Sequence, residues 1–391
     1  MHLSRQLLKN NKNLKIWILC SVPKRYAAKN RTSFDLTSEE IRRIKIIRFW
    51  IPSLGQGFLG SAIAYNFYFI QSIIYSLFIR PDIIISTTAK LFTGLAASIS
   101  ARLLNRKLFL DIRDTFSDNY FYFFRWKKRI FIIGLLILIE NIVIKTAYSI
   151  NLISNGFDNA FFGWQKILKT KKISITYFTN SIDSGVINRI RDLNKNSKSK
   201  NGFYKILYAG NLGIGQDIYS LIKDLENNPS IIKKMINKKI KIIILGSGAQ
   251  LVDIKKLLLK DSNKKNKLIS KVVEYRGLIS KEDIICSYSE VDCLMLQLGK
   301  FSSLSMVIPS KIFEYASTNL PILFGARGYT RKFMRNIEGT IYFKQGESES
   351  FYKAIVKAIK KKINLENREK FLSRYKSENI YKKYADHILN S

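Results

Sequence analysis

Lys311 and Glu314 stand one helical turn apart in the segment MVIPSKIFEYASTNLPILFGARG, which covers residues 306–328. Ser310 precedes them and is a favourable N-cap residue, so the sequence predicts a helix that starts here. After a break at Asn319, the apolar run ILF predicts a short strand that ends in glycine. A lysine near a helix N-terminus attracts anions, and a carboxylate can accept hydrogen bonds from a sugar diol. The segment therefore predicts a site for a ligand that carries both phosphates and hydroxyls.

Glycine-rich loops follow other predicted strands in the same half of the chain. LYAGNLGIGQ at 207–216 and GSG at 246–248 each lie between a strand and a helix, where backbone N–H groups can meet a phosphate or a base. Leu251 occupies the position of the third glycine, so GSG does not complete a dinucleotide fingerprint, and a plain tight turn is the alternative. The binding candidates from these loops and from YRGL at 275–278 are Gly210, Asn211, Gly213, Gln216, Gly246, Ser247, Gly248, Arg276 and Gly277.

In the first half of the chain, Asp111, Arg113 and Asp114 follow a predicted strand at 107–111. Ligands of α/β proteins bind at the carboxyl ends of strands, so these residues are catalytic candidates. Arg113 could stabilise a departing phosphate, and Asp111 or Asp114 could orient an acceptor hydroxyl. A salt-bridged structural corner is the alternative. The spacing D-x-x-D is not the D-x-D of metal-using transferases, so we expect no metal.

Composition limits the classes of function. Of 391 residues, 47% are apolar and the net charge is +37. The apolar fraction is compatible with two folded domains, and the charge fits an anionic partner such as a lipid surface, with a solvated basic surface that has no specific partner as the alternative. No nucleic-acid-reading motif accompanies the charge, so we expect no nucleic-acid partner. The three cysteines are scattered and the two histidines lie near the chain ends, which predicts neither disulfides nor a metal site and favours the cytoplasm.

Strands alternate with helices along the whole chain, which predicts an α/β protein with parallel sheets. The polar, basic run at 191–202 separates two such series and is the predicted linker. We therefore expect two doubly wound, Rossmann-like domains facing a cleft. Their predicted limits are 1–190 for the N-terminal acceptor-side domain and 203–367 for the nucleotide-sugar domain, with a helical segment at 368–391 packing back on the first domain.

Seven segments in order resemble the retaining GT-B glycosyltransferases of family four, in the branch that builds capsule and O-antigen sugars on lipid carriers. They are DIRDTFSD, ISNGFDNAF, TNSID, LYAGNLGIGQ, ILGSGAQ, YRGLISKEDI and the segment around Lys311, and they span nearly the whole chain. The resemblance implies that Glu314 holds the ribose of the donor and that residues 275–278 read the nucleobase. It also implies that the first strand of the N-terminal domain is missing, because the sequence starts in what resembles the first helix.

The sequence departs from the family pattern at Ser181 of TNSID, where the family has glycine, and at two places in the donor half. Many members carry an arginine and a lysine in the loop at 207–216, whereas this chain has Asn211 and Gln216. We therefore assign neutralisation of the diphosphate to Lys311, with Arg276 or Arg327 as helpers. The family often shows a second glutamate eight residues before Glu314, and Met306 occupies that position here.

Two apolar segments raise the question of a membrane. Residues 58–79 are long enough to span a bilayer, but Asn66 and Gln71 interrupt them, so we expect a core helix. Residues 130–144 are too short to span and follow the aromatic and basic run FYFFRWKKR at 121–129. Aromatic and cationic residues together are typical of an interfacial anchor, with an ordinary core helix as the alternative. We expect peripheral attachment through residues 121–144 to the inner face of the cytoplasmic membrane.

These features together predict a retaining, metal-independent glycosyltransferase of the hexosyl or N-acetylhexosaminyl type. The donor is a nucleotide-sugar, of the UDP class, and serves as substrate, so no cofactor is expected. The acceptor is a lipid-linked sugar in bacterial surface polysaccharide synthesis. One alternative is a non-hydrolysing UDP-sugar epimerase, against which the poverty of histidine argues. The other is a degenerate, non-catalytic protein that binds lipid or polyanions.

Overall fold

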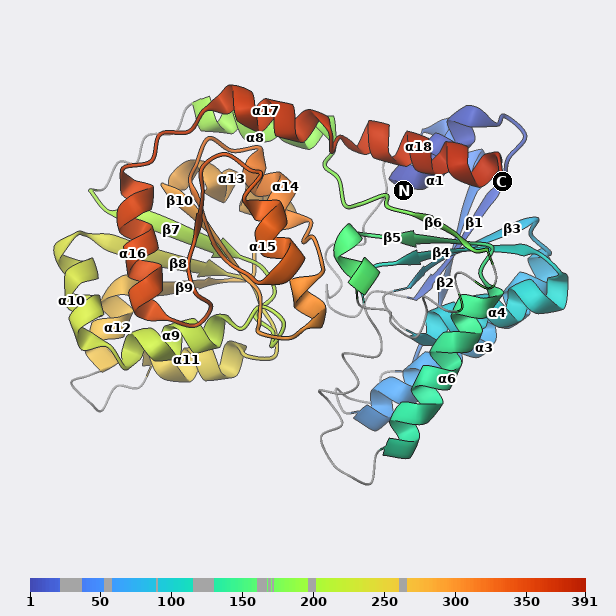
Figure 1. The fold of residues 1–391 in the computed structure, drawn as a ribbon, viewed down its shortest axis with the longest axis horizontal. Coiled ribbons are helices and arrows are strands. Elements are labelled where there is room, and N and C mark those ends of the chain that lie inside the picture. Colours follow the sequence, from blue (N-terminus) through green and yellow to red (C-terminus); the bar gives the residue numbers. More distant parts are fainter. Residues whose placement is uncertain are drawn as a thin grey trace. The chain divides into compact units, whose positions relative to one another are not determined.

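The computed structural model describes residues 1–21, 37–52, 58–88, 91–114, 130–159, 167, 170, 172–195, 202–259 and 266–391. The chain forms two compact units (Figure 1), the first of Met1–Thr179 with Glu378–Ser391 and the second of Asn180–Ser377. The expected limits at 190 and 203 both fall inside the second unit. Residues 191–195 of the expected linker belong to helix α8 (Ser184–Lys195), which is amphipathic and buries Ile187 and Ile190. Residues 196–201 lie outside the described part of the chain.

The second unit is built on a six-stranded parallel sheet in the order β12-β11-β10-β7-β8-β9. The strands are β7 (Tyr204–Ala209), β8 (Ile240–Leu245), β9 (Val273–Gly277), β10 (Cys293–Gln297), β11 (Ile322–Gly325) and β12 (Thr340–Tyr342). Numbered within the unit, the order is 6-5-4-1-2-3, which is that of the doubly wound dinucleotide-binding fold. The expected α/β class with parallel sheets is confirmed.

Helices cover both faces of this sheet because successive side chains of each strand point to opposite sides. Ile206 and Tyr208 of β7 face one core, whereas Leu207 and Ala209 face the other. The first core is covered by α9 (Ile218–Glu226), α10 (Pro229–Asn237), α11 (Leu251–Leu259), α12 (Asn266–Val272) and α16 (Ser348–Ile359). The second is covered by α8, α13 (Lys281–Ser287), α14 (Lys311–Ala316), α15 (Gly328–Met334) and α17 (Leu365–Ser373).

The first unit also contains parallel strands. β1 (Ile16–Ser21) pairs with β2 (Ile44–Phe49), and β3 (Ile83–Thr88), β4 (Lys107–Ile112), β5 (Ser149–Leu152) and β6 (Ser174–Thr176) form a four-stranded sheet in that order. Helix α1 (His2–Asn10) and helix α18 (Ser377–Leu389) share a small core in which Leu7 and Phe109 meet Tyr384 and Ile388. Of the segment 368–391, α18 thus lies almost wholly in the first unit, whereas α17 lies in the second. The first unit also contains α2 (Ser38–Arg43).

Three further helices of the first unit are α3 (Phe58–Ile79), α4 (Leu91–Leu104) and α6 (Ile130–Thr146), and α4 packs against both of the others. The expectation that 58–79 is a core helix is wrong: of the side chains described on α3, Ser72 alone is buried, and Phe78 is 86% exposed. Helix α4, which packs on α3, is rich in small residues and buries Gly94, Ala96, Ser98 and Ser100 among others. Among the described residues, no helix is long and apolar enough to cross a membrane.

Candidate functional site

The strand order of the second unit reverses between β7 and β10, which is where open α/β sheets bind their ligands. The helix after β7 packs on one face, and the helix after β10 packs on the other. Between them, the loop after β7 meets the segment after β10, since the backbone N–H of Gly299 donates to the carbonyl of Gly215 at 2.7 Å. The buried Gln297 amide also donates to the carbonyls of Gln216 and Asp217. Side chains from these two segments therefore form the candidate site.

The glycines of this region allow two loops to touch through their backbones. The N–H of Leu212 donates to the carbonyl of Ser247 at 2.9 Å, and the N–H of Gly210 donates to that of Leu245 at 2.9 Å. Gly246 has φ +135°, and a Cβ there would lie 1.8 Å from the Gly210 carbonyl oxygen. A Cβ on Gly248 would likewise lie 2.5 Å from the backbone of Leu212. The close packing of the two loops alone thus explains why GSG contains glycines, as the alternative of a plain tight turn predicts.

Asn211 and Gln216, which stand where many family members carry cations, bond to each other instead. The Asn211 Nδ2 donates to Gln216 Oε1 at 3.1 Å across Gly213, where a Cβ would lie 2.7 Å from Asn211 Nδ2. The Tyr208 hydroxyl donates to the Asn211 carbonyl at 2.7 Å and fixes the start of the loop. The loop is therefore held in shape by neutral groups and adds no positive charge of its own.

Lys311 is the first residue of α14 and lies against this loop. A Cβ on Gly210 would be 3.4 Å from Lys311 Cε, so the lysine stem passes directly over that glycine. Ser310 occupies the N-cap position and is exposed, but its side chain makes no capping hydrogen bond, which corrects the expected cap. Because α14 has six residues, its dipole is weak, and the charge of Lys311 is the larger attraction for an anion.

Glu314 is held by a residue that the sequence did not single out. The hydroxyl of Tyr288, 1% exposed, donates to Glu314 Oε2 at 3.0 Å. Burial, together with the neighbouring Tyr315 and Glu314, raises the pKa of Tyr288, so its hydroxyl stays protonated and available as a donor. Glu314 itself is only partly buried, which leaves carboxylate surface for a second hydrogen-bond donor.

A buried arginine on α17 fixes the other end of α14. Arg368 is 2% exposed and donates to the carbonyls of Tyr315, Ala316, Thr318 and Leu320 at 3.0 to 3.3 Å. Burial lowers its pKa to about 10, which still leaves it charged at neutral pH. A cation at a helix C-terminus satisfies the carbonyls that lack helical partners. Arg368 thus anchors the carboxyl end of the helix that carries Lys311 and Glu314.

Other predicted binding residues of the second unit occupy different places. Arg276 pairs with Glu274 at 2.7 Å and with Glu290 at 3.8 Å, so an incoming diphosphate would compete with two carboxylates for it. Gly277 has φ +94°, and its carbonyl accepts from the N–H of Gly246 at 2.8 Å. Arg327 is exposed at the start of α15. The structure brings Lys311 together with Gly210, but it does not establish the same for Arg276 or Arg327.

In the first unit, Asp111 is a structural corner. It is 3% exposed, and its two oxygens accept from Arg113 Nε at 2.8 Å and from Asn151 Nδ2 at 2.7 Å. Burial alone would lower the pKa of Arg113, but Asp111 and Tyr381 raise it above the ordinary arginine value. Asp114 is half-buried, and burial raises its pKa. Of the two aspartates, Asp114 is the less buried. Residues 115–129, including the aromatic and basic run, lie outside the described chain.

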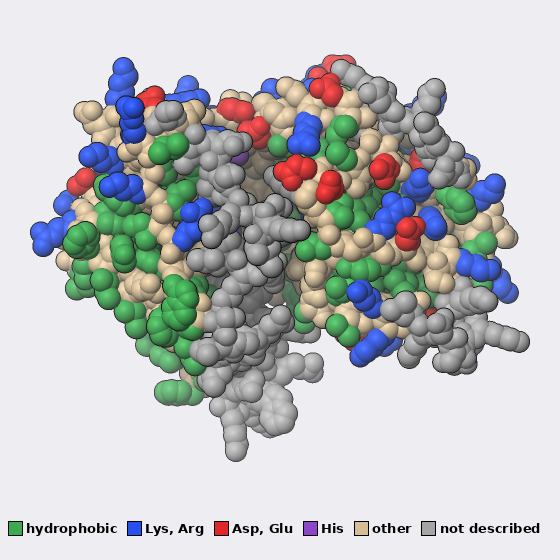
Figure 2. Space-filling model, turned by 180° about the vertical axis from the view of Figure 1, so that it is seen from behind, with side chains coloured by type: hydrophobic (Ala, Val, Ile, Leu, Met, Phe, Trp, Pro, Cys, Tyr) green, Lys and Arg blue, Asp and Glu red, His purple; other side chains and the backbone are tan. Residues whose placement is uncertain are grey.

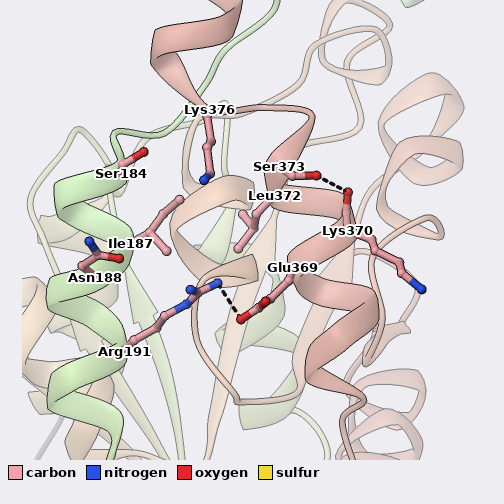
Figure 3. Close-up of a pocket in the computed structure, with 9 residues that line it drawn as sticks. All are labelled: Ser184, Ile187, Asn188, Arg191, Glu369, Lys370, Leu372, Ser373 and Lys376. Atoms are coloured by element: carbon pink, nitrogen blue, oxygen red, sulfur yellow. Dashed lines mark hydrogen bonds and ion pairs between the residues drawn. The ribbon is translucent and has the colours of Figure 1, made fainter.

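The second unit also has a groove between α8 and α17, away from these residues. It has a volume of about 300 Å³, a floor that includes Ile187 and Leu372, and the Arg191–Glu369 ion pair of 3.1 Å across it (Figure 3). A second cavity of about 250 Å³ lies between Leu245 of the sheet and Ile279. Of the predicted site residues, Arg276 lines the second cavity and none lines the groove.

No protein-family model and no curated protein matches the chain. Its two Rossmann-like units have the GT-B fold, and solved glycosyltransferase structures share it. Anabaena HepE in complex with UDP and glucose is 14% identical with a TM-score of 0.62, over 90% of this chain and 88% of that one. Sucrose-phosphate synthase from Thermosynechococcus elongatus is 11% identical with a TM-score of 0.67, over 99% and 91%. A glycosyltransferase from Rickettsia africae is 13% identical with a TM-score of 0.55, over 96% and 99%. At these identities the likeness establishes the fold.

Proposed function

We propose that the protein is a glycosyltransferase that takes a sugar from a UDP-sugar donor. The observation that carries the proposal is the placement of Lys311 against the loop at the switch point of a doubly wound sheet, with Glu314 one turn further along the same helix. The diphosphate of the donor would lie against Lys311 and the loop of Gly210, and the ribose diol would donate to Glu314. The structural neighbour HepE has been solved with UDP-glucose, which supports this class of donor.

The acceptor side belongs to the first unit in this proposal. Asp114 orients the acceptor hydroxyl, while Arg113, held by Asp111, supplies positive charge near the departing phosphate. The hydroxyl attacks the anomeric carbon on the face that the diphosphate leaves, so configuration is retained. As the new glycosidic bond forms, the bond from that carbon to the diphosphate oxygen breaks and the hydroxyl proton passes to the departing diphosphate, which Lys311 stabilises without a metal. The acceptor is a lipid-linked sugar of a bacterial surface polysaccharide, as in capsule or O-antigen synthesis. Transfer takes place at the inner face of the cytoplasmic membrane, to which the protein attaches through the region 121–144.

The test is UDP binding by isothermal titration calorimetry, followed by a thermal-shift panel of nucleotide-sugars. Lys311→Ala removes a charge-assisted contact of about 1.5–3 kcal/mol, so UDP should bind roughly 10- to 100-fold more weakly. Glu314→Ala should weaken UDP binding through loss of the ribose contact. Lys357→Ala, on an exposed face of α16, is the matched control and should bind UDP as the wild type does. Unchanged UDP affinity in both site variants would refute the assignment.

Two other outcomes would indicate a different function. Turnover of a free UDP-sugar without any acceptor would indicate the epimerase. Binding of vesicles with no detectable binding of any nucleotide would indicate a non-catalytic lipid-binding protein.

A further inference from the structure

Helix α3 presents a continuous apolar stripe to solvent. Its six members recur at intervals of three, four or one residue, which places them on one face of the helix. Phe78 is 86% exposed and Ile74 57%. The stripe consists of Ile63, Phe67, Ile70, Ile74, Leu77 and Phe78. Exposed apolar stripes of this kind mark interaction surfaces, so this stripe is available to an apolar partner.

The first half of α6 continues the apolar surface. Phe131 is 83% exposed and Leu138 55%, whereas Val143 and Ile144 near the end of α6 are buried. Between α3 and α6 lies α4, which adds Phe92 to the same exposed set. Figure 1 shows α3 and α6 extending from the sheet of the first unit, and Figure 2 shows hydrophobic side chains gathered over one side of that unit.

Charge at this surface favours an anionic partner. The helices α3, α4 and α6 together contain one carboxylate, Glu140, which is 3% exposed. Cations stand near the helix ends instead: Arg80 directly follows α3, Arg102 lies in the last turn of α4, and Lys145 lies in the last turn of α6. In the sequence, RWKKR directly precedes α6. An apolar surface bordered by cations is suited to acyl chains beneath anionic headgroups.

A tryptophan borders the stripe, and two tyrosines are exposed elsewhere on the same helix. Trp50 is 67% exposed, and its ring meets that of Phe67 edge-on at 6.1 Å. Tyr65 and Tyr75 are also exposed on α3. Tryptophan and tyrosine prefer the level of lipid headgroups, where the apolar ring and the polar group are both satisfied.

We propose that α3 and the first half of α6 are a bilayer-docking surface, whose apolar side chains enter the acyl region of an anionic membrane. A second copy of the chain would cover one side of each helix. Successive residues of a helix are 100° apart, so the exposed residues of α6 cover more than half of its circumference. A lipid phase can surround a helix that is exposed in this way, whereas a rigid protein face cannot. This inference rests on the membrane attachment proposed above and adds α3 to it, but it does not depend on the donor chemistry.

The test compares the wild-type protein with the double variant Ile70→Asp, Ile74→Asp. Sedimentation with vesicles of phosphatidylcholine and phosphatidylglycerol at three to one measures the partition coefficient, and pure phosphatidylcholine vesicles measure its dependence on anionic lipid. We expect wild-type binding that is stronger to the anionic vesicles and a loss of roughly tenfold or more in the double variant. The matched control is Val252→Asp, Leu365→Asp, which changes two exposed apolar residues of the second unit and should leave binding intact.

Three results would overturn the proposal. One is a wild-type protein that does not sediment with either vesicle. Another is a double variant that binds as tightly as the wild type. The third is a wild-type dimer in light scattering that the double variant converts to a monomer, without vesicle binding, since this would assign the surface to a second copy. UDP titration of the same samples is a separate readout, because loss of vesicle binding with retained UDP binding leaves the proposed transferase function standing.

Discussion

Replacing Tyr288 by phenylalanine removes the hydroxyl that donates to Glu314 Oε2 at 3.0 Å and leaves the ring in place. The ring packs edge-on against Tyr315 at a centroid distance of 5.8 Å, so the core should keep its shape. Because Glu314 is partly exposed, water can take the vacant place on the carboxylate. We expect a loss of about 1 kcal/mol in the free energy of unfolding.

The effect on the donor follows from the freedom that Glu314 gains. With the hydroxyl present, the carboxylate is held in one orientation before the ligand arrives. Without it, binding has to immobilise the side chain, at about 0.5–1.5 kcal/mol. That range corresponds to UDP binding weakened by roughly 2- to 12-fold. Titration calorimetry with UDP and with its 2′,3′-dideoxy analogue measures this change, and the loss should appear with UDP and vanish with the analogue that lacks the ribose diol.

Tyr177→Phe is the matched control, because Tyr177 also donates to a carboxylate, that of Asp158, but in the first unit. It should leave UDP affinity unchanged. Wild-type affinity for UDP in Tyr288→Phe would refute the reasoning. An equal loss with both nucleotides would refute it too, since the defect would then not act through the ribose.

Gly246→Ala should lower the free energy of unfolding in chemical denaturation by roughly 3 kcal/mol or more, because the new Cβ would lie 1.8 Å from the Gly210 carbonyl oxygen. The control is Gly134→Ala, where a Cβ would have nothing within 4 Å, and it should be neutral or stabilising. Burial lowers the pKa of His387 below its ordinary 6.5, so the unfolded chain binds a proton before the folded one does and stability should fall as the pH drops below about 6.5. His387→Gln should flatten that pH dependence between pH 7.5 and 5.5, and an unchanged slope would contradict the assignment. Burial raises the pKa of Cys293 to about 12, so Ellman's reagent should not label it before unfolding, and rapid labelling of Cys20→Ser, Cys286→Ser protein would contradict this.

Local patterns predicted most of the fold because each strand is short, apolar and bounded by turn residues. The expected strand at 107–111 corresponds to β4 within a residue, and the short strand expected after Asn319 corresponds to β11. The helix at 58–79 also has the expected ends, but the prediction that it would be buried was wrong. Apolar content predicts a helix but not what covers it, because the helix that packs on α3 lies elsewhere in the chain.

The candidate site was predicted only where it is local in sequence. Lys311, Glu314 and the loop of Gly210 were visible as motifs. Tyr288 and Arg368, which hold α14, could not be recognised from the sequence. Their roles depend on contacts with residues 26 and about 50 positions away in the chain. An arginine at the start of a polar helix such as α17 looks like an ordinary surface residue, and only the packing of α17 on α14 buries it.

The chain enters the second unit at Asn180 and leaves it at Ser377, and backbone hydrogen bonds join the chain near these two points. Ile182 donates to the carbonyl of Tyr375 at 3.0 Å, and Ser377 donates back to Ile182 at 2.8 Å. The second unit is therefore an uninterrupted insertion whose two ends are adjacent, so it can close as soon as it emerges from the ribosome. The first unit cannot complete its core until later, because α18, which supplies Tyr384 and Ile388 to the core around Phe109, is synthesised only after all of the second unit. During synthesis, every strand of the first unit is made before the second unit, but the core around Phe109 lacks its α18 side chains until the end of the chain is made.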